Sequence, residues 1–269
     1  TTTGIRHIAF DKDRGFLLNG KVVKLKGVNL HQDHAGVGSA MPDGLQEWRL
    51  KELKKYGVNA YRASHNPATP ETLDACDRLG ILVIDENRLS GINEYQKHVL
   101  GSMIERDRNH PGVILWSVAN EEWGMEWNVF GERLAKSMQD YCHWLDPTRP
   151  VTGATSSGPT IIAPLDVAGY NYIMQNPVDE NRSKFPNRCA VGTEETSGCG
   201  TRGVYFDDRQ NGHMKAINRS PEGKDSTLNC IERGWRFYHE RPWLAGLFYW
   251  TGFDYRGEPN PLGFPATGS

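Results

Sequence analysis

The sequence predicts an α/β fold, a (β/α)8 or TIM barrel, on three observations. Eight short apolar runs recur between residues 24 and 253, and continuous runs of this kind are typical of parallel strands buried on both faces. Helical patterns separate most of these runs, which favours a parallel sheet with crossover helices. A length of 269 residues also suits a single barrel.

The elements alternate along the chain. The expected strands are Leu25–Leu30, Ala60–Ser64, Ile81–Asp85, Val113–Asn120, Val151–Ala154, Val167–Tyr172, Ala190–Glu194 and Leu244–Phe253. The expected helices are Leu45–Tyr56, Pro70–Leu79, Glu94–Arg108, Asn128–Leu145 and Thr227–His239. Asp43 precedes the first helix, and Thr69 precedes the second, whose Pro70 suits a first turn. Gly57 and Gly80 are expected just past helix ends.

Three parts of the chain depart from this repeat. Residues 155–166 and 173–188 show no helical pattern, so the helices after the fifth and sixth strands are expected to be degenerate. The chain stops at Ser269, before a complete eighth helix, so the final helix is expected to be truncated. Residues 195–226 form a long stretch rich in Gly, Asp, Asn and Arg. A loop of this length is typical of an active-site wall.

Two domain parts are expected. Residues 1–23 are interpreted as a lead-in segment from a preceding domain, with a hairpin around Asn19–Gly20. Residues 24–269 are interpreted as the barrel, incomplete at its C-terminus. Because Thr1–Gly4 resembles a cut inside a longer protein, the missing signal peptide leaves the compartment unknown. No run of about 20 apolar residues occurs, so we expect a soluble protein, with periplasm and secretion both open for its full-length form.

Composition narrows the class of partner. A formal net charge of −2 gives no reason to expect nucleic acid or an acidic membrane surface. Eight Trp give mild support to carbohydrate binding, because Trp stacks on sugar faces but also fills cores. Five scattered Cys include no CxxC pair, so neither zinc nor a disulfide framework is predicted.

Polar and aromatic side chains gather where the predicted strands end. In a TIM barrel the functional residues lie at these C-terminal ends. The residues there are Asn29, His31, Asp33, Arg62, His65, Asn66, Asp85, Glu86, Asn120, Glu121, Tyr170, Asn171, Tyr172, Glu194 and Trp250. Their concentration on one rim predicts an active site at this end of the barrel.

Glu121 and Glu194 each close an apolar run. A carboxylate there is costly unless it sits at a solvated mouth where it takes part in chemistry. Two such carboxylates facing one cleft are the equipment of a retaining or inverting glycosidase, one protonated and one anionic. Alternatively, Glu121 pairs with a helix N-terminus. Glu195 competes with Glu194, since alternation along a strand sends only one inward; we favour Glu194.

Other rim residues have a functional and a structural interpretation. Asn120 can donate to a sugar hydroxyl beside Glu121. Arg62 and His65 either bind substrate or form ion pairs at the barrel mouth. His31 and Asp33 are metal-ligand types, but no third ligand follows at suitable spacing, so we expect no metal and assign both residues to substrate binding.

Aromatic and basic residues leave similar alternatives. Trp250 is either barrel packing or a floor under a sugar ring. Tyr172 is either a core residue or a phenol that holds Glu194 by a hydrogen bond. A basic cluster in the long loop is interpreted as a solvated face that could also meet an acidic sugar: Arg202, Arg209, Lys215 and Arg219.

At these residues the chain resembles glycoside hydrolase family 2, the β-galactosidase and β-glucuronidase family. The matching stretches span nearly all of the chain in the family's order: Gly27–His31, Arg62–Pro67, Leu82–Glu86, Arg108–Pro111, Trp116–Glu121, Gly192–Glu194 and Phe248–Trp250. The resemblance implies that Glu121 is the acid/base and Glu194 the nucleophile. It also implies that Asn120 bonds the sugar 2-hydroxyl, that Tyr172 orients Glu194, and that further residues line the sugar site: His31, His65 and Trp250.

The resemblance implies a retaining exo-β-glycosidase that hydrolyses terminal β-linked sugars by double displacement. The Gly27–His31 and Arg62–His65 patterns and the stretch 253–259 look most like β-galactosidases, whereas Asn87–Gly91 lacks the Glu-x-His pair that binds magnesium in the large bacterial ones. Alternatives are a β-glucuronidase or β-galacturonidase and a non-catalytic carbohydrate-binding barrel. We expect a glycoside or oligosaccharide substrate, no cofactor, and a possible homo-oligomer through domains absent from this chain.

Overall fold

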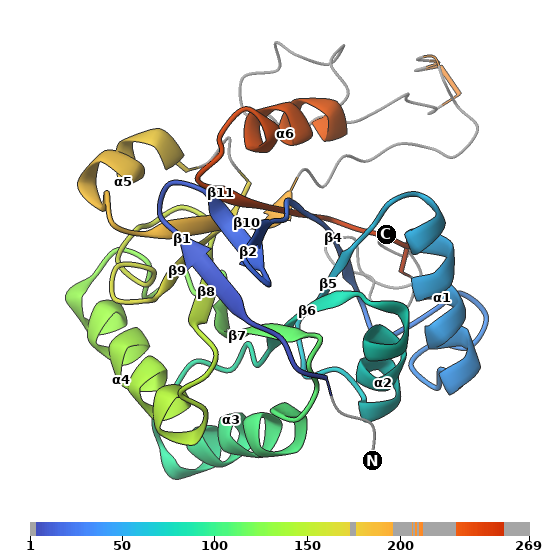
Figure 1. Cartoon of the computed structure of the whole chain (residues 1–269), viewed down its shortest axis with the longest axis horizontal. Helices are drawn as coiled ribbons and strands as arrows, with labels where there is room; N and C mark the ends of the chain where they lie inside the picture. The colour runs from blue at the N-terminus through green and yellow to red at the C-terminus, as the bar shows by residue number, and fades with distance from the viewer. Residues whose placement is uncertain are drawn as a thin grey trace.

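The protein is a closed barrel of eight parallel strands with helices outside it (Figure 1). A computed structural model describes residues 4–172, 176–195, 206, 208, 210–211 and 230–255; the side chains of residues 230–233 are not described. Strand order around the barrel is β10-β11-β4-β5-β6-β7-β8-β9. The bounds are β4 Leu25–Leu30, β5 Ala60–Ala63, β6 Leu82–Glu86, β7 Val113–Asn120, β8 Val151–Thr155, β9 Val167–Asn171, β10 Cys189–Glu195 and β11 Leu244–Tyr249.

The predicted fold class and the eight predicted strands are confirmed, with small shifts at their ends. The largest shift is at β11, which ends at Tyr249 rather than Phe253. The chain turns there onto the neighbouring strand, where the Gly252 N–H donates to the Asn29 carbonyl (2.9 Å). The basic cluster of the long loop, residues 256–259 and the expected truncated end lie outside the described residues.

The helices are α1 Asp43–Lys55, α2 Pro70–Leu79, α3 Glu94–Asp107, α4 Val129–Leu145, α5 Val178–Lys184 and α6 Cys230–His239. The Thr69 side chain caps α2 by accepting from the Thr72 N–H, and Gly80 ends that helix in the left-handed conformation, as predicted. Asp43 is the first residue of α1 rather than its cap, which is Pro42.

The segment 173–188 contains a helix that the sequence did not predict. The helix α5 has seven residues, with acidic side chains in its first turn and basic ones in its last. This charge order stabilises a helix through its dipole, but a helix this short shows no apolar period. Residues 155–166, where no helix was expected either, form turns and bends.

A three-stranded antiparallel sheet lies across the N-terminal end of the barrel (Figure 1). Its strands are β1 Ile8–Asp11, β2 Gly15–Leu18 and β3 Lys21–Val22. The predicted turn at Asn19–Gly20 joins β2 to β3, and both turn residues have positive φ. Phe16 is fully buried against the lower barrel interior, in one cluster with Leu25, Ile114 and Val191. The sheet therefore closes the base of the barrel.

The apolar core has two parts. The base cluster just described fills the lower interior, and a larger cluster packs the outside of the strands against the helices. Cys76, Cys142 and Cys189 are buried free thiols in these clusters. Within the part of the chain that the structure describes, no helix is long and apolar enough to cross a membrane. With its base filled by apolar side chains, the barrel leaves its other end for polar groups.

Candidate active site

Polar side chains from neighbouring strands converge inside the C-terminal end of the barrel. They are joined by hydrogen bonds and are nearly all buried. The group comprises Asn29 of β4, Arg62 of β5, Glu86 of β6, Ser117 and Asn120 of β7, Asn171 of β9, and Thr193 and Glu194 of β10. Most of the polar residues expected at the strand ends thus belong to one connected cluster.

One amide nitrogen links the two carboxylates that the sequence singled out. Asn171 Nδ2 donates to Glu121 Oε1 (3.2 Å) and to Glu194 Oε2 (3.3 Å). The Thr193 hydroxyl donates to Asn171 Oδ1 (2.7 Å), which fixes the orientation of the amide. Because a single atom reaches both carboxylates, Glu121 and Glu194 face the same gap.

Donors surround Glu194. Arg62 Nη1 lies 3.2 Å from Oε2, the Tyr172 hydroxyl donates to Oε1, and His65 Nε2 is 3.9 Å from Oε2. The neighbouring Glu195 instead accepts from the Tyr238 hydroxyl of α6 (2.9 Å), outside the barrel wall. Alternation along β10 therefore turns Glu194, and not Glu195, into the site.

Glu121 occupies a different environment. Burial, and next the charge of Glu194, raise its pKa from the usual 4.5 to about 7, although the hydrogen bond from Asn171 opposes the rise. Its backbone has φ of 55°, in the left-handed region that non-glycine residues rarely adopt. It does not begin a helix, since α4 starts at Val129. Glu121 and Glu194 thus lie in different environments, and the pKa of Glu121 is raised.

Arg62 is the centre of the buried network. It contacts Glu86 Oε2 through Nη2 (2.6 Å) and Nε (2.8 Å), and it donates to Asn29 Oδ1 (3.0 Å) and Asn120 Oδ1 (2.8 Å). Its side chain is fully buried. Arg62 therefore fixes the positions of Glu194 and Asn120. Its contacts are those of the ion-pair interpretation, one of the two that the sequence left open for this residue.

Glu86 balances the charge of Arg62. Its Oε1 contacts His65 Nδ1 (2.8 Å), and its Oε2 accepts from the Ser117 hydroxyl (2.8 Å). Burial opposes ionisation, but Arg62, His65 and Ser117 together keep the pKa of Glu86 below its usual value. Glu86 therefore fixes both the guanidinium of Arg62 and the imidazole of His65 by direct contacts.

Aromatic rings form one wall of the site. His65 and Trp250 stack with ring centroids 5.2 Å apart and an interplanar angle of 8°. His31 packs edge-on against Trp250 (5.0 Å) and His65 (5.8 Å). The structure thus brings these three predicted site residues together, at the ends of β4, β5 and β11. Trp250 remains partly exposed, as a surface for a ligand must be.

Four residues of the predicted rim are not joined to this cluster by the described contacts: Asp33, Asn66, Asp85 and Tyr170. Asp85, for example, accepts from the Ala68 N–H instead (3.0 Å). Asp33 lies in the loop after β4, and its Oδ1 is enclosed without a hydrogen-bond partner among the described residues. Its charge acts on Arg49 of α1, where it opposes the burial that lowers the pKa of that guanidinium. A role for Asp33 in substrate binding therefore stays a prediction.

Several residues of the site received no role from the sequence: Asn29, Glu86, Ser117, Asn171, Thr193 and, in the loop after β7, Glu126. Glu86 and Asn171 lie at strand ends, and this location marked them as candidates. The sequence does not show that their side chains point into the barrel. Glu126 gave no such signal. It is a fully buried loop carboxylate that accepts from the N–H groups of Ser156 (3.0 Å), Ser157 (2.9 Å) and Gly158 (3.2 Å). It fastens the loop after β7 to the loop after β8.

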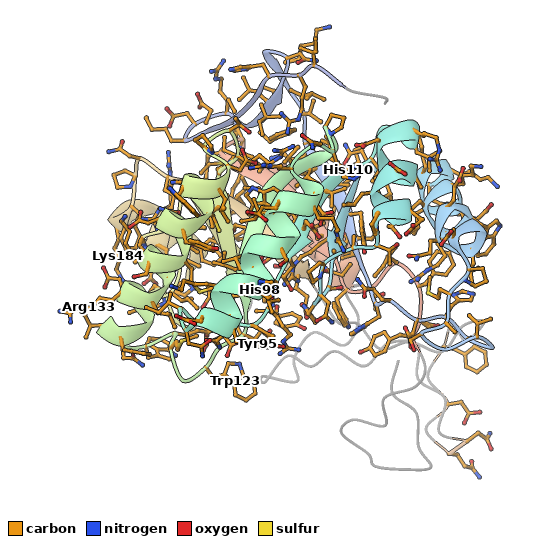
Figure 2. All side chains as sticks on the ribbon, turned by 90° about the horizontal axis from the view of Figure 1, so that it is seen from below. Tyr95, His98, His110, Trp123, Arg133 and Lys184 are labelled. Atoms are coloured by element: carbon orange, nitrogen blue, oxygen red, sulfur yellow. The ribbon has the colours of Figure 1, made fainter. Side chains whose placement is uncertain are left out.

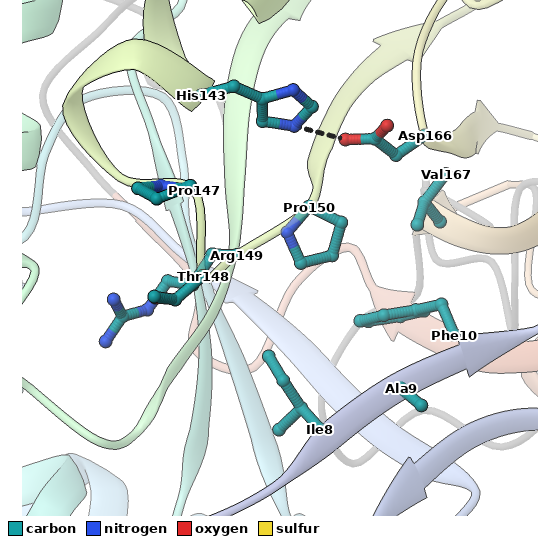
Figure 3. Close-up of a pocket in the computed structure, with 10 residues that line it drawn as sticks. All are labelled: Ile8, Ala9, Phe10, His143, Pro147, Thr148, Arg149, Pro150, Asp166 and Val167. Carbon is teal, nitrogen blue, oxygen red and sulfur yellow. Dashed lines mark hydrogen bonds and ion pairs between the residues drawn. The ribbon is translucent and has the colours of Figure 1, made fainter.

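Two other features lie away from the cluster. Among the described residues, Asp74, Asp77 and His110 form the one group of donors close enough to hold a cation, within 4.8 Å. Two hydrogen bonds already use Asp77, from Gly112 N (2.7 Å) and with His110 (2.8 Å). A pocket of about 340 Å³ lies between β1 and the start of β8, where His143 pairs with Asp166 (Figure 3). Both features lie toward the base of the barrel.

Comparisons with known proteins extend these observations. The family model for the TIM barrel domain of glycosyl hydrolases family 2 matches residues 10–181. Beta-galactosidase BoGH2A of Bacteroides ovatus is 33% identical over 100% of this chain and 38% of its own length. A putative beta-glucuronidase of Formosa agariphila is 31% identical over 96% of this chain and 28% of its own length.

A solved structure gives the same result in three dimensions. A glycosyl hydrolase family 2 member from Bacteroides cellulosilyticus matches with a TM-score of 0.77 and 35% identity, over 94% of this chain and 31% of that one. The chain therefore spans well under half the length of these relatives. Since the family model covers more than half of the chain, the chain belongs to glycosyl hydrolase family 2.

Proposed function

We propose that this chain is the catalytic barrel of a retaining exo-β-glycosidase, and specifically of a β-galactosidase. The observation that carries the proposal is the amide of Asn171, which reaches Glu121 and Glu194 at once. Retaining enzymes place their two carboxyl groups about 5 Å apart, whereas inverting enzymes leave room for a water between them. Two carboxylates that share one donor atom favour the retaining arrangement.

In the first step, an oxygen of Glu194 attacks the anomeric carbon and the bond to the leaving oxygen breaks. Glu121 gives its proton to that oxygen, so the leaving group departs as a neutral alcohol. A pKa near 7 keeps a large fraction of Glu121 protonated at neutral pH. Tyr172 and Arg62 hold Glu194 in place for the attack.

In the second step, Glu121 acts as the base. It takes a proton from a water whose oxygen attacks the anomeric carbon and displaces Glu194. The sugar leaves with its original configuration, and both carboxyl groups return to their starting states. The aromatic wall beside Glu194, with the stacked rings of His65 and Trp250, is suited to hold the sugar ring during both steps.

Two variants test these roles in the full-length protein. Glu194→Gln should abolish turnover, and a variant with the original rate would rule out this nucleophile. Glu121→Ala should slow substrates with poor leaving groups far more than those with good ones, because only the former need the proton. Equal slowing of both kinds would contradict the acid/base assignment. Proton NMR of the first sugar anomer released tests retention directly.

A β-glucuronidase is the second candidate, favoured by the similarity to the putative beta-glucuronidase of Formosa agariphila. The arginines that could meet an acidic sugar lie in the long loop outside the described residues. A panel of nitrophenyl β-glycosides separates the two activities. A β-galactosidase should hydrolyse the galactoside and ignore the glucuronide. The opposite preference would replace the first candidate by the second.

A further inference from the structure

Large aromatic side chains are exposed on the loop that follows Glu121. Trp123 and Trp127 are 71% and 65% exposed, and Phe130 at the start of α4 is 67% exposed. Trp116, on the strand just before this loop, is by contrast fully buried. Exposed aromatic groups gathered in one short segment are typical of a binding surface.

This segment lies beside the catalytic centre. The Trp123 N–H donates to the Glu121 carbonyl (3.0 Å), and two residues of chain span at most about 7 Å. Figure 2 shows Trp123 projecting from the end of the molecule opposite the β1–β3 sheet. That is the end where the strand termini carry the two carboxylates.

Buried contacts fix the segment in place. Glu126, between the two tryptophans, accepts hydrogen bonds from three successive N–H groups of the loop after β8. Trp127 Nε1 donates to the Ser157 hydroxyl (3.2 Å) in that same loop. A Cβ on Gly158 would stand 2.1 Å from the Glu126 carbonyl oxygen, so the two loops pack closely. A surface held in this way loses little entropy when it binds a ligand.

The order of strands around the barrel shows which part of a substrate the segment faces. The segment follows β7, and β11, which leads to Trp250, lies on the opposite side of the barrel. The aromatic wall of His31, His65 and Trp250 is therefore across the mouth from Trp123. Since Glu121 protonates the oxygen that joins sugar and leaving group, the loop continuing from it lies on the leaving-group side.

The chemistry of the segment suits a saccharide. Pyranose rings have an apolar face that stacks on indole, as well as hydroxyls that need polar partners. Glu122 is half-buried beside the tryptophans, and Arg88 acts on its charge from the loop after β6. A carboxylate and a guanidinium bind hydroxyl groups, which a purely apolar leaving group would lack.

We propose that Trp123 and Trp127 form a platform that binds the leaving-group sugars of an oligosaccharide, so that the substrate is a saccharide chain rather than a small glycoside. The inference rests on the proposed glycosidase function. It assigns the exposed aromatic residues to substrate selection, and Glu126 to positioning them.

The test compares two substrates of the full-length protein: methyl β-galactoside and a tetrasaccharide that ends in β-galactose. Both leaving groups are alcohols that need the proton of Glu121, but methanol is too small to reach the platform. Trp123→Ala and Trp127→Ala should each lower kcat/KM for the tetrasaccharide about tenfold, or about 1.4 kcal/mol. For methyl β-galactoside kcat/KM should change less than about twofold.

Trp144→Ala is the matched control, because Trp144 is 76% exposed but lies in the last turn of α4. It should alter neither substrate. Equal losses on both substrates in the platform variants, or no loss on the tetrasaccharide, would overturn the platform and leave the glycosidase intact. If the unmodified protein hydrolyses neither galactoside nor any other β-glycoside, the proposed function fails and the platform with it.

Discussion

The charge of Glu194 should set part of the pKa of Glu121. Asn171 Nδ2 lies 3.2 Å from Glu121 Oε1 and 3.3 Å from Glu194 Oε2, so these two oxygens are at most about 6.5 Å apart. Two like charges at about 6.5 Å interact by about 2.6 kcal/mol at an effective dielectric constant of about 20, or about two pKa units. Burial is the larger cause of the rise to about 7. Removing the charge by Glu194→Gln should therefore lower the pKa of Glu121 from about 7 toward its usual value of 4.5.

The assay is a carbon-13 NMR titration of labelled glutamate side chains, which needs no turnover. Glu195→Gln is the matched control, because it removes the neighbouring carboxylate that faces Tyr238 outside the barrel. The control should leave the pKa of Glu121 where it is. If Glu194→Gln also leaves it unchanged, the two carboxylates do not share a pocket, and the proposed mechanism loses its geometric basis.

Three further predictions concern stability. Glu121→Gln should stabilise the protein by about 3 kcal/mol at about pH 8 in urea denaturation, because the folded pKa of about 7 exceeds the usual 4.5 and ionisation therefore costs the folded state. This gain should vanish toward about pH 4. Glu86→Gln should lower the free energy of unfolding by about 3 kcal/mol and reduce kcat, because it leaves the buried Arg62 with less compensating charge. An unchanged denaturation curve would show that Glu86 is dispensable for stability. Phe16→Ala should cost about 3–5 kcal/mol in thermal denaturation with kcat nearly unchanged below the transition, because Phe16 fills the base and touches no site residue; a large drop in kcat would contradict this separation of base and site.

The barrel could be predicted because each strand is buried on both faces and therefore reads as a short apolar run. Shorter or half-exposed elements gave no such pattern. The helix α5 has seven residues, fewer than two apolar periods would need. The strand β1 is only partly buried along its length, and the hairpin predicted over Ile8–Val23 did not separate it from β2.

The site was predictable to the extent that strand ends mark it. Glu121 directly follows β7 and Glu194 is the penultimate residue of β10. Glu194 contacts Asn171 inside the barrel, whereas Glu195 faces Tyr238 outside it. What one sequence cannot show is which distant groups meet. Glu126 accepts hydrogen bonds from N–H groups about thirty residues further along the chain, and neither segment has a sequence pattern that predicts this contact.

The barrel interior is divided into an apolar base and a charged opposite end, and this division bears on function. The base holds apolar side chains around Phe16, whereas the opposite end holds a guanidinium and two carboxylates with almost no exposure. Replacing a buried ion network by apolar residues is often neutral or stabilising, so stability alone does not explain why charges occupy this end. They are explained if the anion of Glu194 must be held rigidly beside a carboxyl that stays protonated near neutral pH. An apolar replacement of Arg62 together with Glu86 should then preserve folding while removing turnover, and retained turnover would show that the network serves only the fold.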